Sequence, residues 1–405
     1  MLQYCYYITQ GSCLEFSNAL SSGNIYIHHY AILLPVLTFR DQFAFQPTGS
    51  TTAAIVHLVH TITAFLENNP FVVVVALDFS KAFDSVRHSA VIGKFSLLHM
   101  PDHIYNWIEA FFRNHSHCTR SGNVVSQLRT ISASIIQGSS IGPASYVVTA
   151  SDLRPVSPNN FISKYADDTY LIIPADNIHS CSEEINNVDT WALKNNLKLN
   201  RSKSVEIVFV RHRGRDLTAG LPSTVSGFTR VDSIKVLGVT FSRKFSVSQH
   251  VDQLLAACSQ SLFALRTLRQ HGLPADALHV VFQAIVANKL LYASPAWWGF
   301  ASADDLNRLE GFLRRSAKLG YRATSTTFAS MCADADDQLF AKLTCNTQHL
   351  LHDLLPPLRE QHYSLRERSH NYCLPDRAST LMDKNFLIRM LFKDLGCSQS
   401  RLTSL

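Results

Sequence analysis

Hydrophobic positions along the chain change from a mixed pattern to a helical one near Ser246. Before that point, apolar residues recur at helical spacing from Gly49 to Glu67. Phe71–Leu77 (FVVVVAL) is a β-branched run typical of a buried central strand. Phe161–Ile173 has two apolar arms around an acidic tip, which predicts a β-hairpin. The pattern therefore predicts a mixed α/β region followed by an all-helical one.

Other segments extend this division. Helices are expected over Ser89–His99, Asp102–Phe112, Ser182–Asn195, Ala275–Tyr292 and Asp304–Leu319, with another beginning at Gly142. Strands are expected over residues 122–136, Val205–Val210 and Ile234–Phe241. The helix after Gly49 has three possible N-caps, Ser50, Thr51 and Thr52. Residues 1–29 show no clear periodicity and stay unassigned.

Composition is that of a globular protein, since 46% of the 405 residues are hydrophobic and 17% are charged. The longest apolar run, Phe71–Leu77, is far shorter than the ~20 residues that a spanning helix needs, so no membrane association is expected. The nine Cys are scattered without a CxxC pair. This usage argues against a disulfide framework or a zinc site and favours an intracellular location, nuclear or cytoplasmic.

The net charge of +6 is unevenly distributed. Residues 201–320 hold 16 Lys/Arg against 8 Asp/Glu, which is +8, so the rest of the chain sums to −2. A basic second half suits a surface that follows phosphates, although a solvated basic face would give the same count.

Three carboxylates carry the clearest chemistry. Asp78 ends the predicted central strand, and Asp167 and Asp168 sit at the predicted hairpin tip. Carboxylates brought together from separate strands repel each other unless a divalent ion lies between them. Two such ions about 3.5–4 Å apart are the device for in-line nucleotidyl transfer. Taken alone, the acidic tip could be a solvated hairpin, and Asp78 could be a helix N-cap or an edge residue.

Other residues stand where such chemistry needs them. Phe83, a bulky aromatic, follows Asp78 within FSKAFD. Gln137 and Gly138 open the loop QGSSIGP, where the backbone can approach a base pair or phosphate closely. Lys203 could donate a proton to a leaving pyrophosphate, with a solvated lysine as the alternative.

In chain order, LDFSKAFDSVRH, QGSSIGP, YADD, LKLNRSK and VLGVTF resemble the successive palm motifs of reverse transcriptases. The longer phrases resemble the branch carried by non-LTR retrotransposons, here as a partial open reading frame. KLLYASPAWWG and LRRSAKLGY resemble the thumb and C-terminal segment of the same elements.

The resemblance implies an α+β fold, the right-hand polymerase palm, with a mixed, mostly antiparallel sheet. Residues 30–242 would form truncated fingers and the palm, and residues 243–325 a helical thumb. Residues 326–405 would form a helical and irregular C-terminal extension. The implied activity is that of an RNA-directed DNA polymerase acting on an RNA template, a DNA primer and deoxynucleoside triphosphates.

The resemblance also implies a role for each motif residue. Two Mg²⁺ or Mn²⁺ ions would be held by Asp78, Asp167, Asp168 and the backbone carbonyl of Phe79. Phe83 would exclude a ribose 2′-hydroxyl, Gln137 and Gly138 would pack against the incoming nucleotide, and Lys203 would be the general acid. The residues expected at the primer grip and on the template–primer surface are Leu237, Gly238, Val239, Arg266, Arg269, Arg314 and Arg315.

Two departures from the family pattern affect the expected activity. Gln46, in FAFQPTGSTT, stands where relatives often place an arginine that meets the triphosphate. In addition, Ile32–Thr38 runs almost directly into RDQFAFQ, which indicates shortened fingers. The chain as given is therefore expected to bind primed nucleic acid but to polymerise poorly, unless Arg40 or a residue among the first 30 replaces the missing cation.

Three hypotheses follow from these observations. The first is a reverse transcriptase, and the second is a catalytically impaired retroelement remnant that only binds nucleic acid. The third is another palm enzyme, such as a nucleotide cyclase, which also uses a strand Asp and an acidic hairpin. QGSSIGP, Lys203 and the basic helical region disfavour the third, because a cyclase has no template to hold.

Overall fold

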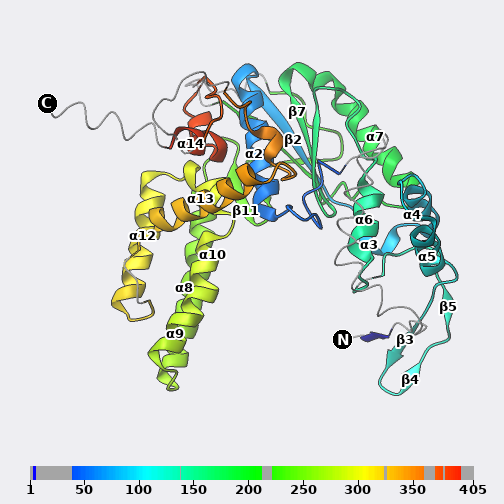
Figure 1. Ribbon diagram of the computed structural model, residues 1–405, viewed down its shortest axis with the longest axis horizontal. Helices are drawn as coiled ribbons and strands as arrows, with labels where there is room; N and C mark the ends of the chain where they lie inside the picture. The colour runs from blue at the N-terminus through cyan, green and yellow to red at the C-terminus, as the bar shows by residue number, and fades with distance from the viewer. Residues whose placement is uncertain are drawn as a thin grey trace.

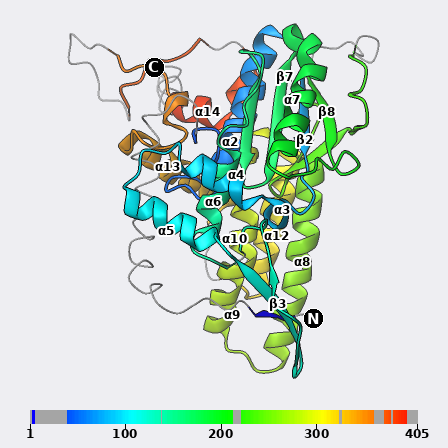
Figure 2. The same cartoon turned by 90° about the vertical axis from the view of Figure 1, so that its right-hand side faces the viewer.

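The computed structural model describes residues 39–136, 138–211, 221–322, 326–359, 370–376 and 379–393, together with the backbone of residues 3–5. Figure 1 shows a sheet at the top of the molecule with two limbs extending below it. One, called the helical limb below, consists of helices between residues 248 and 318, and the other ends in a small sheet that includes residues 116–130. Figure 2 shows the same arrangement from the side of the small sheet.

The central sheet has five strands, β2 (Phe71–Leu77), β6 (Phe161–Tyr165), β7 (Asp168–Pro174), β8 (Val205–Val210) and β9 (Thr229–Arg230). Their order is β6-β7-β2-β8-β9. β2 pairs antiparallel with β7 and β8, whereas β9 pairs parallel with β8. The expected mixed, mostly antiparallel sheet is confirmed, and so are the central strand and the acidic hairpin.

β-branched side chains place β2 in the middle of the sheet because they pack well on both faces. Val72 and Val74 belong to one hydrophobic core and Val73 and Val75 to another, and all four are at most 1% exposed. Period-2 alternation therefore makes one strand part of two cores, and the carboxyl end of β2 is held rigidly between them.

One face of the sheet is covered by α2 (Thr51–Asn68), whose N-cap is Ser50. The Ser50 Oγ accepts a hydrogen bond from the Ala53 N–H at 3.0 Å, as one of the three capping possibilities predicted. The opposite core takes in α3 (Ala82–Ser85), α4 (His88–Phe95), α5 (Asp102–Phe112), α6 (Gly142–Ala150) and α7 (Cys181–Lys194). A 3-10 turn at Ala175–Ser180 leads into α7.

Two strand predictions need correction. The hairpin expected within 122–136 starts earlier, since the small sheet contains β1 (Gln3–Cys5), β3 (Ser116–Ser121), β4 (Val124–Val125) and β5 (Arg129–Thr130). The single strand expected over Ile234–Phe241 is instead a hairpin of β10 (Ser233–Val236) and β11 (Val239–Ser242). Leu237 and Gly238 reverse the chain there, both at positive φ (44° and 94°), as type I′ turns require.

The second half is helical, as predicted. Its elements are α8 (Ser248–Gln270), α9 (Ala275–Val281), the π-helical η2 (Phe282–Ala287), α10 (Asn288–Leu291), α11 (Ser294–Trp297), η3 (Trp298–Phe300), α12 (Ala303–Lys318), α13 (Phe328–Cys345), η4 (His352–Leu354), η5 (Met382–Lys384) and α14 (Phe386–Phe392). The helix expected over Ala275–Tyr292 is thus subdivided.

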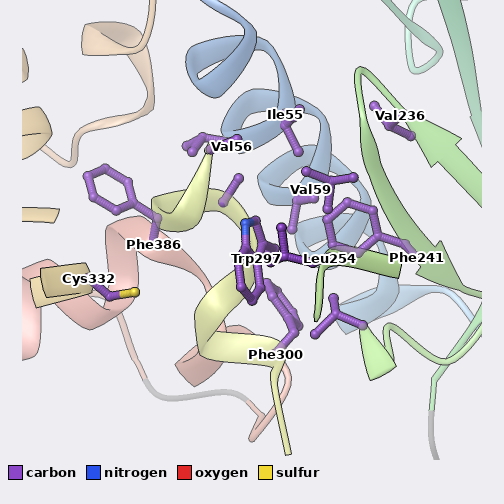
Figure 3. Close-up of a cluster of buried hydrophobic side chains, with 14 of the residues drawn as sticks. Ile55, Val56, Val59, Val236, Phe241, Leu254, Trp297, Phe300, Cys332 and Phe386 are labelled. Carbon is purple, nitrogen blue, oxygen red and sulfur yellow. The ribbon is translucent and has the colours of Figure 1, made fainter. Parts of the chain in front are cut away.

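Trp297, fully buried, lies at the centre of the core that unites these helices with the sheet. Figure 3 shows it among Val59 of α2, Leu254 of α8 and Phe241 of β11. The helical region, α2 and the β10–β11 hairpin therefore share one hydrophobic core, which fixes the hairpin relative to the central sheet.

Ala275–Phe300 is the one helical series in the described ranges that is long and apolar enough to cross a membrane by length and composition. Of an apolar stretch of 18 residues within it, 39% is buried inside the protein. Ala293 interrupts the series at a left-handed φ of 49°. Such a series also occurs in soluble cores, so it is weak support for a membrane span.

Candidate active site

The central sheet brings the three predicted carboxylates to one edge. The last ladder pair between β2 and β7 joins Leu77 to Thr169, so Asp78 and Asp168 follow and precede it on neighbouring strands. Tyr165 pairs with Asp168, which leaves Ala166 and Asp167 as a two-residue turn. Asp78 therefore lies at the end of the central strand and Asp167 at the adjacent hairpin tip, the placement expected from the sequence.

The electrostatics of this edge reflect crowded negative charge. Burial, and after it the charge of Asp78, raises the pKa of Asp167. Burial raises the pKa of Asp168 as well, with further contributions from Asp167 and Asp78. Negative charge at this edge thus makes ionisation of Asp167 and Asp168 less favourable, which a nearby cation would reverse.

A divalent cation suits these donors, because hard cations prefer carboxylate and carbonyl oxygens. The side chains are not yet gathered around one point: among the described residues, no group of three or more His, Cys, Asp or Glu side chains is positioned to hold a metal ion. Consecutive residues of a strand point to opposite faces, so Asp167 and Asp168 do not both point the same way. The chemistry of the donor set therefore fits a cation, with local adjustment of side chains.

Asp78 is anchored by the loop that carries Lys203. The Asn200 N–H donates to the Asp78 carbonyl at 2.8 Å, and the Asp78 N–H donates to the Ser204 Oγ at 3.0 Å. Phe79 and Leu199 form an isolated antiparallel bridge that uses the Asp78 carbonyl and not the Phe79 carbonyl. Lys203 is exposed on this loop, next to the residue that binds the Asp78 backbone.

A cavity of about 400 Å³ lies between α3 and the start of α6. It is lined by Phe83 of α3, by Ile135, Ile136, Gly138, Ser139 and Ser140 of the segment before α6, and by Gly142 and Pro143 of its first turn. Phe83 stacks on the buried Tyr146 with ring centroids 4.4 Å apart. Burial, and after it the charges of Asp167 and Asp168, raise the pKa of Tyr146, so the ring that supports Phe83 also experiences the field of the acidic turn. Phe83 and Gly138 share one cavity, and Gln137 lies outside the described residues.

The β10–β11 turn is held by two tyrosines. The Tyr292 Oη donates to the Leu237 carbonyl at 2.9 Å, and a Cβ on Gly238 would lie 3.1 Å from the Tyr292 Cε1. The Leu237 backbone also lies near the hydroxyl of Tyr170, two residues beyond Asp168 on β7, and offsets part of the rise in the Tyr170 pKa that burial causes. The predicted primer grip is thereby tied to the strand that carries Asp168.

The helical limb presents a basic cavity of about 550 Å³ between α8 and α12, lined by Leu255, Arg308, Gly311, Arg314, Arg315 and Lys318. Arg314 and Arg315 were expected on a cationic surface, and both are exposed. The side chain of Arg269 instead donates to the Leu319 carbonyl at 2.6 Å and lies over the Tyr321 ring, while Arg266 is exposed elsewhere on α8.

Gln46, which stands in the place of the cation, and Arg40, which was considered as its substitute, both have partners, whereas the first 30 residues lie outside the described ones apart from the backbone of residues 3–5. The Gln46 Nε2 donates to the Phe39 carbonyl at 3.4 Å. Arg40 forms an exposed ion pair with Asp353 at 2.6 Å, toward the C-terminal part of the chain. The shortened segment Ile32–Thr38 lies outside the described residues.

Sequence reasoning missed four residues of this site. Gln42 is buried and its side chain bonds the backbone of Ala166. The other three are tyrosines. Tyr146 stacks on Phe83 of the cavity, whereas Tyr170 and Tyr292 lie against the turn of the second hairpin. Their only sequence signal is a polar group at a position otherwise expected to be apolar, which does not reveal a partner that lies far along the chain, 55 residues away for Tyr292 and 124 for Gln42.

Comparisons with known proteins agree with these observations. The family model described as reverse transcriptase (RNA-dependent DNA polymerase) matches residues 29–241. The RNA-directed DNA polymerase from mobile element jockey of Drosophila melanogaster is 25% identical over 304 residues, which cover 69% of this chain and 32% of the relative. A probable RNA-directed DNA polymerase from transposon BS of the same species is 25% identical over 292 residues, covering 68% of this chain and 32% of the relative.

The chain spans about a third of the length of these curated relatives. Among solved structures, a Candida tropicalis telomerase in complex with a fragment of telomeric RNA aligns with a TM-score of 0.45 and 11% identity. That alignment covers 84% of this chain and 54% of the telomerase chain.

Proposed function

Because the chain belongs to the reverse transcriptase family, we propose that its β2–β7 edge is the active site of an RNA-directed DNA polymerase of non-LTR retrotransposon type. One observation carries the proposal: the Leu77–Thr169 register places Asp78, Asp167 and Asp168 at the same edge of the central sheet. Membership of this family also removes the nucleotide cyclase hypothesis.

Reverse transcriptases use divalent metal, and we propose Mg²⁺ or Mn²⁺ as two ions at this edge. Asp78, Asp167, Asp168 and the Phe79 carbonyl are the proposed ligands. Such ions, when bound, make the primer 3′-hydroxyl a better nucleophile and offset charge that develops on the triphosphate. The carboxylates contribute the negative field that holds them, which is why their mutual repulsion is tolerated in the fold.

Phe83 is proposed to select deoxynucleotides. Its ring is supported by Tyr146, so it forms a rigid wall of the cavity and would collide with a ribose 2′-hydroxyl. Gly138 at φ 82° lets the loop backbone come close to the incoming nucleotide, and Gln137 is proposed beside it. Lys203, exposed on the loop that binds the Asp78 backbone, is proposed to protonate the leaving pyrophosphate.

The second hairpin and the helical limb are proposed to hold the template–primer duplex. Leu237 and Gly238 would contact the primer, and Arg314 and Arg315 would contact phosphates from the cavity between α8 and α12. Arg266 is a further proposed contact, whereas Arg269 would act by shaping this limb. Residues 30–242, 243–325 and 326–405 remain the proposed fingers and palm, thumb and extension. Binding to primed RNA should then weaken steeply with salt.

A second function, nucleic-acid binding with little polymerisation, is favoured by the surroundings of Gln46 and Arg40. Gln46 is neutral and bonded to Phe39, and Arg40 is paired with Asp353. A charge-assisted contact to phosphate is about twice as strong as a neutral one. We therefore expect slow extension from this chain.

Template-dictated extension tests the proposed function. Four primed RNA templates that differ in the first templating base are each offered single deoxynucleotides with Mg²⁺ or Mn²⁺. The protein should add only the complementary nucleotide, and Asp167→Asn should add none. Addition that ignores the template base, or that survives in Asp167→Asn, would contradict the proposal.

A further inference from the structure

The segment before α2 extends the edge of the central sheet. The Lys164 N–H of β6 donates to the Asp41 carbonyl at 2.7 Å, and the Phe43 N–H donates to the Lys164 carbonyl at 2.8 Å. Gln42 thus forms a parallel bridge with Lys164. Since β6 is an edge strand, this short pairing covers backbone groups that would otherwise lie open next to the acidic turn.

Beyond this bridge the side chain of Gln42 continues the pairing where the backbone departs. The Ala166 N–H donates to the Gln42 Oε1 at 2.9 Å, and the Gln42 Nε2 donates to the Ala166 carbonyl at 3.3 Å. The same Oε1 accepts the Ala44 N–H at 3.0 Å. A carboxamide has the donor and acceptor of a peptide group, so this side chain bonds the turn as another strand would.

The Gln42 amide is itself held rigidly. Its side chain is 1% exposed, and the adjacent Asp41 carboxylate pairs with the Lys164 Nζ at 2.8 Å. Lys164, also 1% exposed, donates to the carbonyls of Ala150 and Leu153 at 2.8 and 3.1 Å. The amide is therefore a fixed point against which the turn is set.

The turn needs external support for two reasons. Ala166 adopts a φ of 55°, which a residue with a Cβ seldom adopts unless its surroundings impose it. The next residues are Asp167 and Asp168, whose like charges favour any conformation that separates them. Without the Gln42 amide, the turn would lose both hydrogen bonds that oppose these tendencies.

We propose that Gln42 is a positioning residue that fixes the Ala166–Asp167 turn, and through it the Asp167 carboxylate, in the geometry needed to receive a divalent cation; the functional part of this inference rests on the proposed polymerase site. The contact requires both halves of the amide, the oxygen for the Ala166 N–H and the nitrogen for its carbonyl. Gln42 itself touches neither metal nor substrate.

Gln42→Met tests this because methionine has a similar length but no donor or acceptor for the turn. Asn69→Leu is a matched control. Asn69 is also buried, donates to the Phe65 carbonyl at 3.2 Å and accepts the Asp176 N–H at 3.0 Å, beyond the other end of the sheet. Each substitution removes a buried amide that bonds backbone, so each is expected to lower the melting temperature.

The first measurement is amide hydrogen exchange of the metal-free full chain, followed on the peptide that spans residues 165–170. We expect faster exchange there in Gln42→Met and an unchanged rate in Asn69→Leu. Gln42→Glu keeps the acceptor but loses the donor, and serves if Gln42→Met does not fold. Equal exchange at the turn in the Gln42 variant and in wild type would overturn the proposal.

The second measurement is primer extension as a function of Mg²⁺ concentration. A misplacement of about 1 Å at a reacting group lowers rates on the order of 10²-fold. Gln42→Met should show a loss of that size and need more Mg²⁺ for half-maximal rate, with primer–template affinity unchanged. A loss equal to that of Asn69→Leu, without a shift in Mg²⁺ dependence, would reduce Gln42 to a structural residue. If wild type extends no primer, the proposed function fails. The exchange measurement still tests whether Gln42 fixes the Ala166–Asp167 turn.

Discussion

Two hairpins belong to the proposed site, and their turns have the same length but different supports. The β6–β7 turn, Ala166-Asp167, carries negative charge, has a non-glycine residue at positive φ, and is held from the side by Gln42. The β10–β11 turn, Leu237-Gly238, has a glycine where strain would be largest and is held by Tyr292 and Tyr170. Asp167 in the first turn is repelled by neighbouring carboxylates, and a bound cation would offset this repulsion. The second turn carries no charge.

We therefore expect the acidic turn to act in the reaction itself and the second turn to position the primer. Changes in the acidic turn should abolish the reaction while leaving binding and folding intact. Changes in the second turn should instead alter primer placement, and more so when they remove more of the contacts that hold the turn. A larger loss of reaction from the second turn than from the acidic turn would contradict this distinction.

The largest effect is expected for Asp167→Asn. Loss of a carboxylate that binds catalytic cations removes several kcal/mol of transition-state stabilisation, or roughly 10³-fold in extension rate. Mg²⁺ should raise the melting temperature of the wild-type chain but not of the variant. Single-turnover extension and thermal melts with Mg²⁺ or a chelator measure both quantities. Retention of full activity by Asp167→Asn would remove the acidic turn from catalysis.

Phe83→Val should relax sugar selection without affecting deoxynucleotide binding strongly. An apolar wall discriminates against one additional hydroxyl by up to about 10²-fold, so the preference for deoxynucleotides should fall by at most that factor. Competitive incorporation of the two nucleotide classes gives the ratio. The same ratio in wild type and variant would remove Phe83 from this role.

In the second hairpin, Gly238→Ala should exceed Tyr292→Phe in effect. Alanine at a φ of 94° is strained and meets the Tyr292 ring, which should destabilise the protein by about 1–2 kcal/mol. Tyr292→Phe removes one hydrogen bond, worth about 0.5–1.5 kcal/mol, and should lower extension about 2–10-fold through weaker primer binding. Urea unfolding and the primer KM test this order. A larger loss from Tyr292→Phe would show that the hydroxyl acts in the reaction itself.

The smallest effect concerns pH and the stability of the metal-free chain. Because the folded-state pKa values of Asp167 and Asp168 are raised above the ordinary value of 3.8, these groups favour folding at acidic pH, and that contribution is lost as the pH rises through their folded-state values. Asp168→Asn should therefore lose less unfolding free energy between pH 4 and 8 than wild type, a window set by that direction of shift. Parallel pH dependence in the two proteins would contradict the repulsion inferred at this edge.

The sequence predicts the parts of this site whose signals are local. The FVVVVAL run, the acidic tip and the motif order located Asp78, Asp167, Asp168 and Phe83, because strands and turns depend on short-range periodicity. Gly238 was predicted in a continuous strand, although Leu237-Gly238 forms the turn. Its register depends on Tyr292 and on a core shared with helices far along the chain.

The residues that hold the turns in place were harder to predict from the sequence than the charged residues. Gln42 and Ala166 are 124 positions apart, and only the folded sheet edge joins them. Arg269 is expected on the template–primer surface because of its charge, and in the structure it donates to the Leu319 carbonyl and lies over the Tyr321 ring. A charge is visible in the sequence, but what satisfies it depends on tertiary packing.

We propose that the carboxylate edge is chemically competent and that the neutral Gln46 weakens the triphosphate side of the site. This proposal is tested by single-nucleotide extension of a DNA primer on an RNA template by wild type, Gln46→Arg and Gln46→Arg/Asp167→Asn. We expect slow extension by wild type, a faster rate for Gln46→Arg, and none for the double variant. Rapid extension by wild type that Gln46→Arg does not increase, or extension that persists in the double variant, would show that the proposal is wrong.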